Sequence, residues 1–247
     1  MLMLPFALMD WGLRFLSRSV HYFRKSAIFA SISFSVIWVA LIVGIVIMIG
    51  GLAGRIIYLL VFAAFFTMYL ANAIYFNLTG YFFSFNLALM AGEGGSYVGD
   101  AMLTTSPWVY IYSVPILITF FYGLIKIKKR DAINKKGIVT LLLVFLLYHL
   151  LLPLTYGKKN TGLDWDTWRN ARNVYENFND ANKDLIICGF YEYTIRDAYM
   201  TFLKAEGDKD PEELAELSEY FATETVHEEN DHTGIYKGKN LIILQME

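Results

Sequence analysis

The sequence SAIFASISFSVIWVALIVGIVIMIGGLAG, which occupies residues 26–54, contains no Asp, Glu, Lys or Arg. Residues 56–92, 101–125 and 137–157 also lack all four charged residue types. An α-helix needs about 20 apolar residues to cross the hydrocarbon core of a bilayer. These stretches therefore predict an all-α polytopic membrane bundle with four full spans, at about residues 26–50, 56–76, 108–125 and 137–156.

The composition supports this class and divides the chain into two parts. Of the 247 residues, 56% are hydrophobic and only 18% are charged, whereas a soluble globular domain carries about 25% charged residues. Residues 1–157 contain 11 basic and 4 acidic side chains, while residues 158–247 contain 10 basic and 19 acidic ones. We expect a transmembrane bundle over residues 1–157, an extracytoplasmic helical linker over residues 158–238, and a separate last segment, residues 239–247.

The orientation follows from the connection between the third and fourth spans. Cytoplasmic loops of membrane proteins are enriched in Lys and Arg. This connection holds a single acidic residue, Asp131, against six basic ones: Lys126, Lys128, Lys129, Arg130, Lys135 and Lys136. The pattern places this loop in the cytoplasm, and it places residues 77–107 and the tail, residues 158–247, outside.

The N-terminal segment conflicts with this orientation, because four spans and an external tail require an external N-terminus. That end is nevertheless basic, with Arg14, Arg18, Arg24 and Lys25. Apolar residues recur there at helical spacing, at Leu13, Leu16, Val20, Phe23 and Ala27. We predict an N-terminal interfacial helix with its basic face toward anionic head groups, and Met1–Met9 as the remnant of a further span. A cytoplasmic N-terminus with one span wrongly assigned is the alternative.

The external connection, residues 77–107, is unusually apolar, with Tyr81, Phe82, Phe83 and Phe85 in succession around Ser84. We interpret it as a connector that lies along the outer surface, with a lipid-facing groove as the alternative. In the tail, Ile195, Tyr199, Phe202 and Leu203 predict a short amphipathic helix. Asp210-Pro211 is a typical helix start.

The last residues predict a different kind of structure. The run Leu241–Leu244 has the length and the β-branched content of a buried strand. Such a strand needs neighbours in a sheet, and the tail contains no comparable strand. We therefore interpret residues 239–247 as the first strand of an α/β domain whose remainder lies beyond this sequence.

Few residues are candidates for chemistry. His149 lies in the fourth span, where ionisable groups are often functional, although a neutral histidine hydrogen-bonded within the bundle is the interpretation we favour. The single cysteine, Cys188, is expected to be buried and inert. Glu247 ends the predicted strand, where α/β sheets place their ligands, and its oxygens suit Mn²⁺ or Mg²⁺. No phosphate-binding loop is present, and no pattern indicates nucleic acid as a partner.

Four segments resemble one family. HTGIYKGKNLIILQME, residues 232–247, closely resembles the entry into the catalytic domain of lipoteichoic acid synthases, which belong to the sulfatase and alkaline phosphatase superfamily. GFYEYTIRD, residues 189–197, is similar to the linker of these enzymes. YLANAIYF, residues 69–76, and the basic loop at residues 126–136 are similar to the layout of their membrane part.

The resemblance implies a phosphoglycerol transferase on the outer face of the cell membrane of a Gram-positive bacterium. Such enzymes transfer glycerol phosphate from phosphatidylglycerol to a polyglycerolphosphate glycolipid and release diacylglycerol. A threonine nucleophile acts beside Mn²⁺, and a ligand of the ion corresponds to Glu247. That nucleophile and the other metal ligands have no counterpart in this sequence, so no catalytic residue is assigned and the chain alone is expected to be inactive.

Two alternatives share the same membrane anchor. In the first alternative, the chain is a non-enzymatic membrane protein that binds or regulates a full-length synthase. In the second, it is the anchor of a related phosphoethanolamine or phosphoglycerol transferase. The resemblance also implies contact with membrane lipids, including phosphatidylglycerol and the glycolipid acceptor, and association with other proteins of cell-envelope synthesis.

Overall fold

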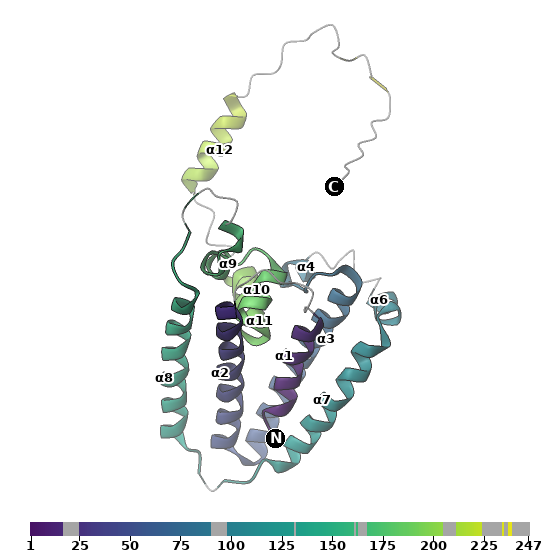
Figure 1. The fold of residues 1–247 in the computed structure, drawn as a ribbon, viewed down its shortest axis with the longest axis vertical. Coiled ribbons are helices and arrows are strands. Elements are labelled where there is room, and N and C mark those ends of the chain that lie inside the picture. The colour runs from purple at the N-terminus through teal and green to yellow at the C-terminus, as the bar shows by residue number, and fades with distance from the viewer. Residues whose placement is uncertain are drawn as a thin grey trace. The chain divides into compact units, whose positions relative to one another are not determined.

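The computed structural model describes residues 1–16, 25–89, 98–130, 132–160, 162, 167–204, 211–223, 234 and 237–238 (Figure 1). The chain forms two compact units, Met1–Lys204 and Ala205–Glu247. The first unit therefore contains the predicted bundle and also residues 158–204 of the predicted linker. The described part of the chain is helical and contains no strand.

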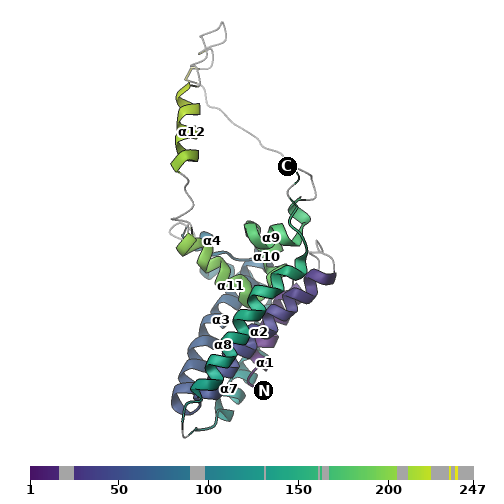
Figure 2. The same cartoon turned by 90° about the vertical axis from the view of Figure 1, so that its left-hand side faces the viewer.

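Four long apolar helices form the body of the first unit (Figures 1 and 2). They are α2 (Lys25–Ile49), α3 (Gly51–Thr79), α7 (Pro107–Lys126) and α8 (Lys135–Leu151). The apolar stretch that contains α8 continues through the 3-10 turn Leu152–Tyr156, and all four are long enough to cross a membrane. The described part of the chain thus contains the four candidate spans that the uncharged stretches predict, as expected of a multi-pass membrane protein.

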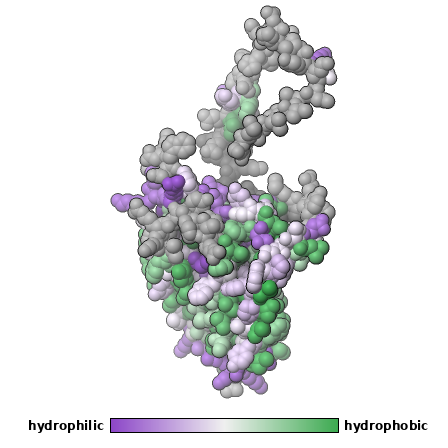
Figure 3. Space-filling model, turned by 45° about the vertical axis from the view of Figure 1, so that its right-hand side comes forward, coloured by the Kyte–Doolittle hydropathy of each residue, from purple (hydrophilic) through white to green (hydrophobic). Residues whose placement is uncertain are grey.

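The sides of these helices expose apolar residues, as expected for a surface that faces lipid (Figure 3). α8 is the clearest case: only 11% of its membrane window is buried, and Leu143, Leu147 and Leu150 are each more than half exposed. In lipid an exposed leucine costs nothing, so these side chains need no protein partner.

One end of the bundle gathers the basic residues. The turn between α2 and α3 contacts the connection between α7 and α8, because Gly51 N–H donates to Lys128 O and Asn134 N–H donates to Met48 O. Arg55, in the first turn of α3, donates from Nη2 to Ile127 O at 3.2 Å. Because its guanidinium reaches the end of the helix, Arg55 does not interrupt the span, and α3 begins at Gly51.

The N-terminal helix α1 (Leu4–Leu16) differs from the prediction. It lies inside the bundle, where Phe6, Met9 and Leu13 are fully buried against α3 and α7. Arg14 points into the bundle and forms an ion pair with Asp10, with 2.6 Å between Nε and Oδ2. At Leu13 and Arg14, where the predicted interfacial helix begins, this prediction is wrong, because Leu13 is buried and Asp10 pairs with the arginine that we expected to face head groups. Residues 17–24 lie outside the described residues.

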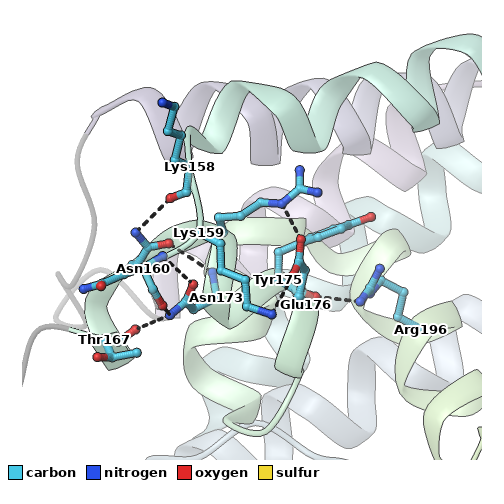
Figure 4. Close-up of polar contacts among 10 residues, drawn as sticks. Lys158, Lys159, Asn160, Thr167, Asn173, Tyr175, Glu176 and Arg196 are labelled. Atoms are coloured by element: carbon cyan, nitrogen blue, oxygen red, sulfur yellow. Dashed lines mark hydrogen bonds and ion pairs between the residues drawn. The ribbon is translucent and has the colours of Figure 1, made fainter. Parts of the chain in front are cut away.

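The opposite end of the bundle is covered by the part of the linker that belongs to the first unit. It consists of the turn Thr167–Arg169 and of α9 (Ala171–Asn177), α10 (Ala181–Cys188) and α11 (Phe190–Tyr199), which continues as a π-helical turn, Met200–Lys204. Asn160 and Asn173 bond each other reciprocally, and Arg196 donates to Tyr175 O at 2.6 Å (Figure 4). Lys159 pairs with Glu176 at 3.1 Å in the same region.

The connection after α3 is fixed to these linker helices. It contains α4 (Phe85–Leu89) and α6 (Val98–Thr104), with residues 90–97 outside the described part. Phe82 N–H donates to Asn182 Oδ1 at 2.8 Å, and Tyr193 OH donates to Phe83 O at 2.8 Å. The Phe82 side chain is 1% exposed. The described part of this connection thus packs on protein as well as running along the bundle end.

The buried face of α11 is not the one that the sequence pattern predicts. The predicted apolar stripe, Ile195, Tyr199, Phe202 and Leu203, is 43 to 72% exposed. The buried face instead carries Phe190, Tyr191, Glu192, Tyr193 and Asp197. The predicted short helix is therefore present, but its apolar stripe is the exposed side, because the buried side meets hydrogen-bonding groups such as Trp38 Nε1 and Phe83 O.

The second unit contains the helix α12 (Pro211–Thr223), which begins at the proline that the sequence indicates. Two of its apolar residues, Leu217 and Phe221, are 52% and 64% exposed. The predicted strand, Leu241–Leu244, and residues 239–247 as a whole lie outside the described residues.

Candidate functional site

Glu192, in the first turn of α11, is a carboxylate with no solvent exposure. Its Oε2 accepts a hydrogen bond from Trp38 Nε1 in α2 at 2.8 Å, and its Oε1 accepts one from Tyr175 OH in α9 at 3.3 Å. His149 Nε2 in α8 lies 3.5 Å from the same Oε1. One carboxylate therefore joins two membrane spans to two linker helices.

His149 is placed by aromatic rings as well as by Glu192. Its imidazole packs edge-on against Phe34 and Trp38 of α2, with ring centroids 5.7 and 6.5 Å apart, and it lies beside Phe145 of its own helix. Its Nδ1 is buried and has no hydrogen-bond partner among the described residues. The structure thus places His149 against Glu192, and a neutral histidine that is hydrogen-bonded within the bundle stays a prediction.

A second buried carboxylate, Asp10, contacts the N-terminal end of α11. Its Oδ1 accepts from Ser35 Oγ at 2.9 Å and from the backbone N–H of Phe190 at 3.0 Å. Its Oδ2 binds Arg14 Nε. Asp10 is 5% exposed. Because the first N–H groups of a helix have no partner within the helix, a carboxylate at this position satisfies one and interacts favourably with the helix dipole.

Together the two carboxylates fix the start of α11 inside the bundle. We call Asp10, Arg14, Ser35, Trp38, His149, Tyr175 and Glu192 the docking cluster. Between them, Tyr191 OH donates to Phe6 O at 2.6 Å and its ring is fully buried. Gly189 makes the approach possible, because a Cβ at this position would lie 2.4 Å from Ser35 Oγ and its φ is +76°. The cluster can position the linker rigidly on the membrane bundle.

Two further carboxylates, Asp184 and Asp197, are buried in α10 and α11. Asp184 in α10 is 1% exposed, and burial raises its pKa to about 8, with a smaller raising effect from Asp180 and Asp197. Burial likewise raises the pKa of Asp197, which accepts from Ser84 Oγ and Phe85 N–H. Asp184 Oδ1 has no hydrogen-bond partner among the described residues. Burial in this position therefore favours the protonated form of Asp184 in the folded protein.

This protonation predicts a pH dependence of stability. The folded protein holds the Asp184 proton up to about pH 8, whereas the unfolded chain releases it near about pH 4. Raising the pH between these values therefore favours the unfolded state, by up to about 1.4 kcal/mol per pH unit. We expect the thermal midpoint in detergent to fall from pH 5 to pH 7, and Asp184→Asn to flatten this slope. An unchanged slope in the variant would show that Asp184 is ionised in the folded protein.

The structure describes two of the three residues that the sequence analysis singles out for chemistry. His149 lies in the docking cluster, and Cys188 is a free thiol with no exposure, as expected. Glu247, the predicted metal ligand, lies outside the described residues. Within the described residues, no group of three or more His, Cys, Asp or Glu side chains is arranged to hold a metal ion.

Sequence reasoning missed Asp10 and Glu192. Asp10 had a usable signal, since an acid four residues before Arg14 in an apolar segment is typical of a neutralised helical pair. Glu192 had a weaker one, because an acid between Tyr191 and Tyr193 is equally compatible with an exposed position. No family model matches the chain, and neither does any curated protein or solved structure.

Proposed function

We propose that this chain is the membrane-anchor portion of a lipoteichoic-acid-synthase-like phosphoglycerol transferase. Three resembling segments support the proposal, at residues 69–76, 189–197 and 232–247. The observation that carries it is the docking cluster, which holds residues 189–197 against α1, α2 and α8. A linker that is fixed on the bundle in this way would hold a following catalytic domain close to its lipid substrates.

The proposed orientation places the basic end of the bundle in the cytoplasm and the docked linker outside a Gram-positive cell membrane. The concentration of Lys and Arg at one bundle end, with Arg55 beside the connection between α7 and α8, supports this direction. The partners in this proposal are membrane lipids, with phosphatidylglycerol as donor and a glycolipid as acceptor.

Glu247 is proposed as a Mn²⁺ ligand on the resemblance alone. A metal ion in such a site stabilises the charge of the transferring phosphoryl group. The residues of this chain that precede Glu247 would hold the linker in place and contribute no nucleophile.

The test begins with the native protein, isolated from the source cells with an antibody against residues 208–231. We expect an immunoblot band well above the 28.3 kDa of this chain. We also expect release of diacylglycerol from labelled phosphatidylglycerol that requires Mn²⁺, stops with chelator and is lost in Glu247→Gln. Glu176→Gln, which changes a surface carboxylate of α9, serves as the matched control and should retain activity.

A band near 28.3 kDa without diacylglycerol release would reject the transferase proposal. Co-purification of a larger synthase with such a product would then favour the regulatory alternative.

A further inference from the structure

An apolar pocket of about 500 Å³ lies between α1, α3 and α7. Its walls are formed by side chains of all three helices, among them Leu16, Tyr69, Val109, Ile111, Tyr112 and Pro115. This volume falls within the range of about 300–1,000 Å³ that is typical of small-molecule sites. The pocket is separate from the docking cluster and shares no residue with it.

Exposed apolar side chains of candidate membrane-spanning helices line part of the pocket. Both α3 and α7 are membrane spans. Three lining residues are strongly exposed, namely Phe15 at 65%, Trp108 at 74% and Ile111 at 53%. Since the surface around the opening is exposed apolar surface on membrane-spanning helices, the material next to the opening is lipid.

One end of the pocket is polar and the other is apolar. Asn77 and Ser106, which line the polar end, lie where α3 ends and α7 begins, and Ser106 N–H donates to Asn77 Oδ1 at 2.9 Å. Pro115 lines the pocket nine residues further along α7, which is about 13 Å deeper at the rise of an α-helix. The pocket is therefore polar at the end formed by Asn77 and Ser106 and apolar over the rest of its length, which matches the polarity of a glycerolipid.

The walls of the slot are fixed by close packing. Tyr112 OH donates to Leu8 O at 3.1 Å, and a Cβ on Gly12 would lie 2.6 Å from the Tyr112 ring. The glycine thus lets α1 lie directly against the Tyr112 ring. Because these contacts hold both sides, the pocket is a built feature and not a gap that side chains can readily fill.

We propose that this pocket binds one acyl chain of a bilayer phospholipid, taken from the leaflet opposite the basic end of the bundle. Helix association within lipid depends on close packing and not on the exclusion of water, so an acyl chain that fills the slot adds contacts to its walls on α1, α3 and α7. The proposal concerns a bound lipid of the bundle and does not depend on the transferase proposal.

The test uses a phosphatidylglycerol with a photoreactive diazirine on one acyl chain, in phosphatidylcholine vesicles that contain the full protein. Labelled peptides are mapped by mass spectrometry. We expect labelling around residues 12–16 and 109–115 to exceed that of the lipid-facing surface of α8 about tenfold, which corresponds to ~1.4 kcal/mol.

Two tryptophan variants on α7 provide the matched comparison. Ile111→Trp fills the slot and is expected to reduce the excess labelling to the level of α8. Ile118→Trp changes a residue that is 63% exposed and lies outside the pocket, so it should leave the excess unchanged. Both positions are exposed, so neither change disturbs the core. Uniform labelling of all lipid-facing helices, or excess labelling that survives Ile111→Trp, would overturn the proposal.

Discussion

Glu192→Ala is expected to increase the rate at which a maleimide labels Cys188 about a hundredfold. The substitution leaves the Trp38 N–H, the Tyr175 hydroxyl and His149 without their shared acceptor in a fully buried site. Loss of one partner from such a buried polar cluster costs about 3 kcal/mol or more, and about 1.4 kcal/mol corresponds to a tenfold change in equilibrium. Cys188 is fully buried at the end of α10, so its labelling reports local opening of α10 and α11.

Two variants separate the buried site from a general effect of charge. Glu192→Gln keeps one carbonyl acceptor and should give an intermediate rate. Glu176→Ala removes a carboxylate of α9 that is 33% exposed and pairs with Lys159 and Arg172, so its effect should stay below about 1 kcal/mol. Equal labelling of Cys188 in Glu192→Ala and Glu176→Ala would contradict the docking role of Glu192.

Asp10→Ala is expected to destabilise the first unit by about 3–5 kcal/mol, because it leaves the Arg14 guanidinium without its carboxylate inside the bundle. The same change removes the acceptor of Ser35 Oγ and of the Phe190 N–H. Thermal unfolding in detergent, followed by tryptophan fluorescence, measures the loss.

The charge itself is isolated by a double variant. Asp10→Ala combined with Arg14→Leu removes both charges, and we expect it to be more stable than Asp10→Ala alone because no uncompensated charge remains. If the stability losses of Asp10→Ala and Arg14→Leu, measured separately, added up to the loss of the double variant, the ion pair would have no energetic role.

The membrane spans were predictable because an uncharged apolar stretch of about 20 residues is rare outside a membrane. The expected spans at 26–50 and 108–125 match α2 and α7 to within about one residue. The predicted second span, residues 56–76, is shorter than α3 (Gly51–Thr79), because Arg55 interrupts the uncharged stretch in the sequence. An arginine at a helix end bonds a neighbouring carbonyl, here Ile127 O, and so does not end the span.

The linker and the N-terminal helix were less predictable because their partners are distant in sequence. Asp10 bonds Phe190, which lies 180 residues away, and Trp38 bonds Glu192 across 154 residues. The spacing of apolar residues locates an apolar helix face. It does not reveal that a distant segment carries hydrogen-bond donors for an acidic side chain. For this reason the sequence predicts an apolar stripe at Ile195 and Tyr199, whereas it does not indicate that Glu192 is buried.

In the orientation that we propose, the bundle holds its docked linker outside the cell, with the basic end in the cytoplasm. Two matched variants test it in a Cys188→Ala background: Lys129→Cys at the exposed basic end, and Lys158→Cys just after the fourth span. We expect a membrane-impermeant maleimide to label Lys158→Cys in intact cells, and to label Lys129→Cys only after permeabilisation. Labelling of Lys129→Cys but not of Lys158→Cys in intact cells would contradict the account.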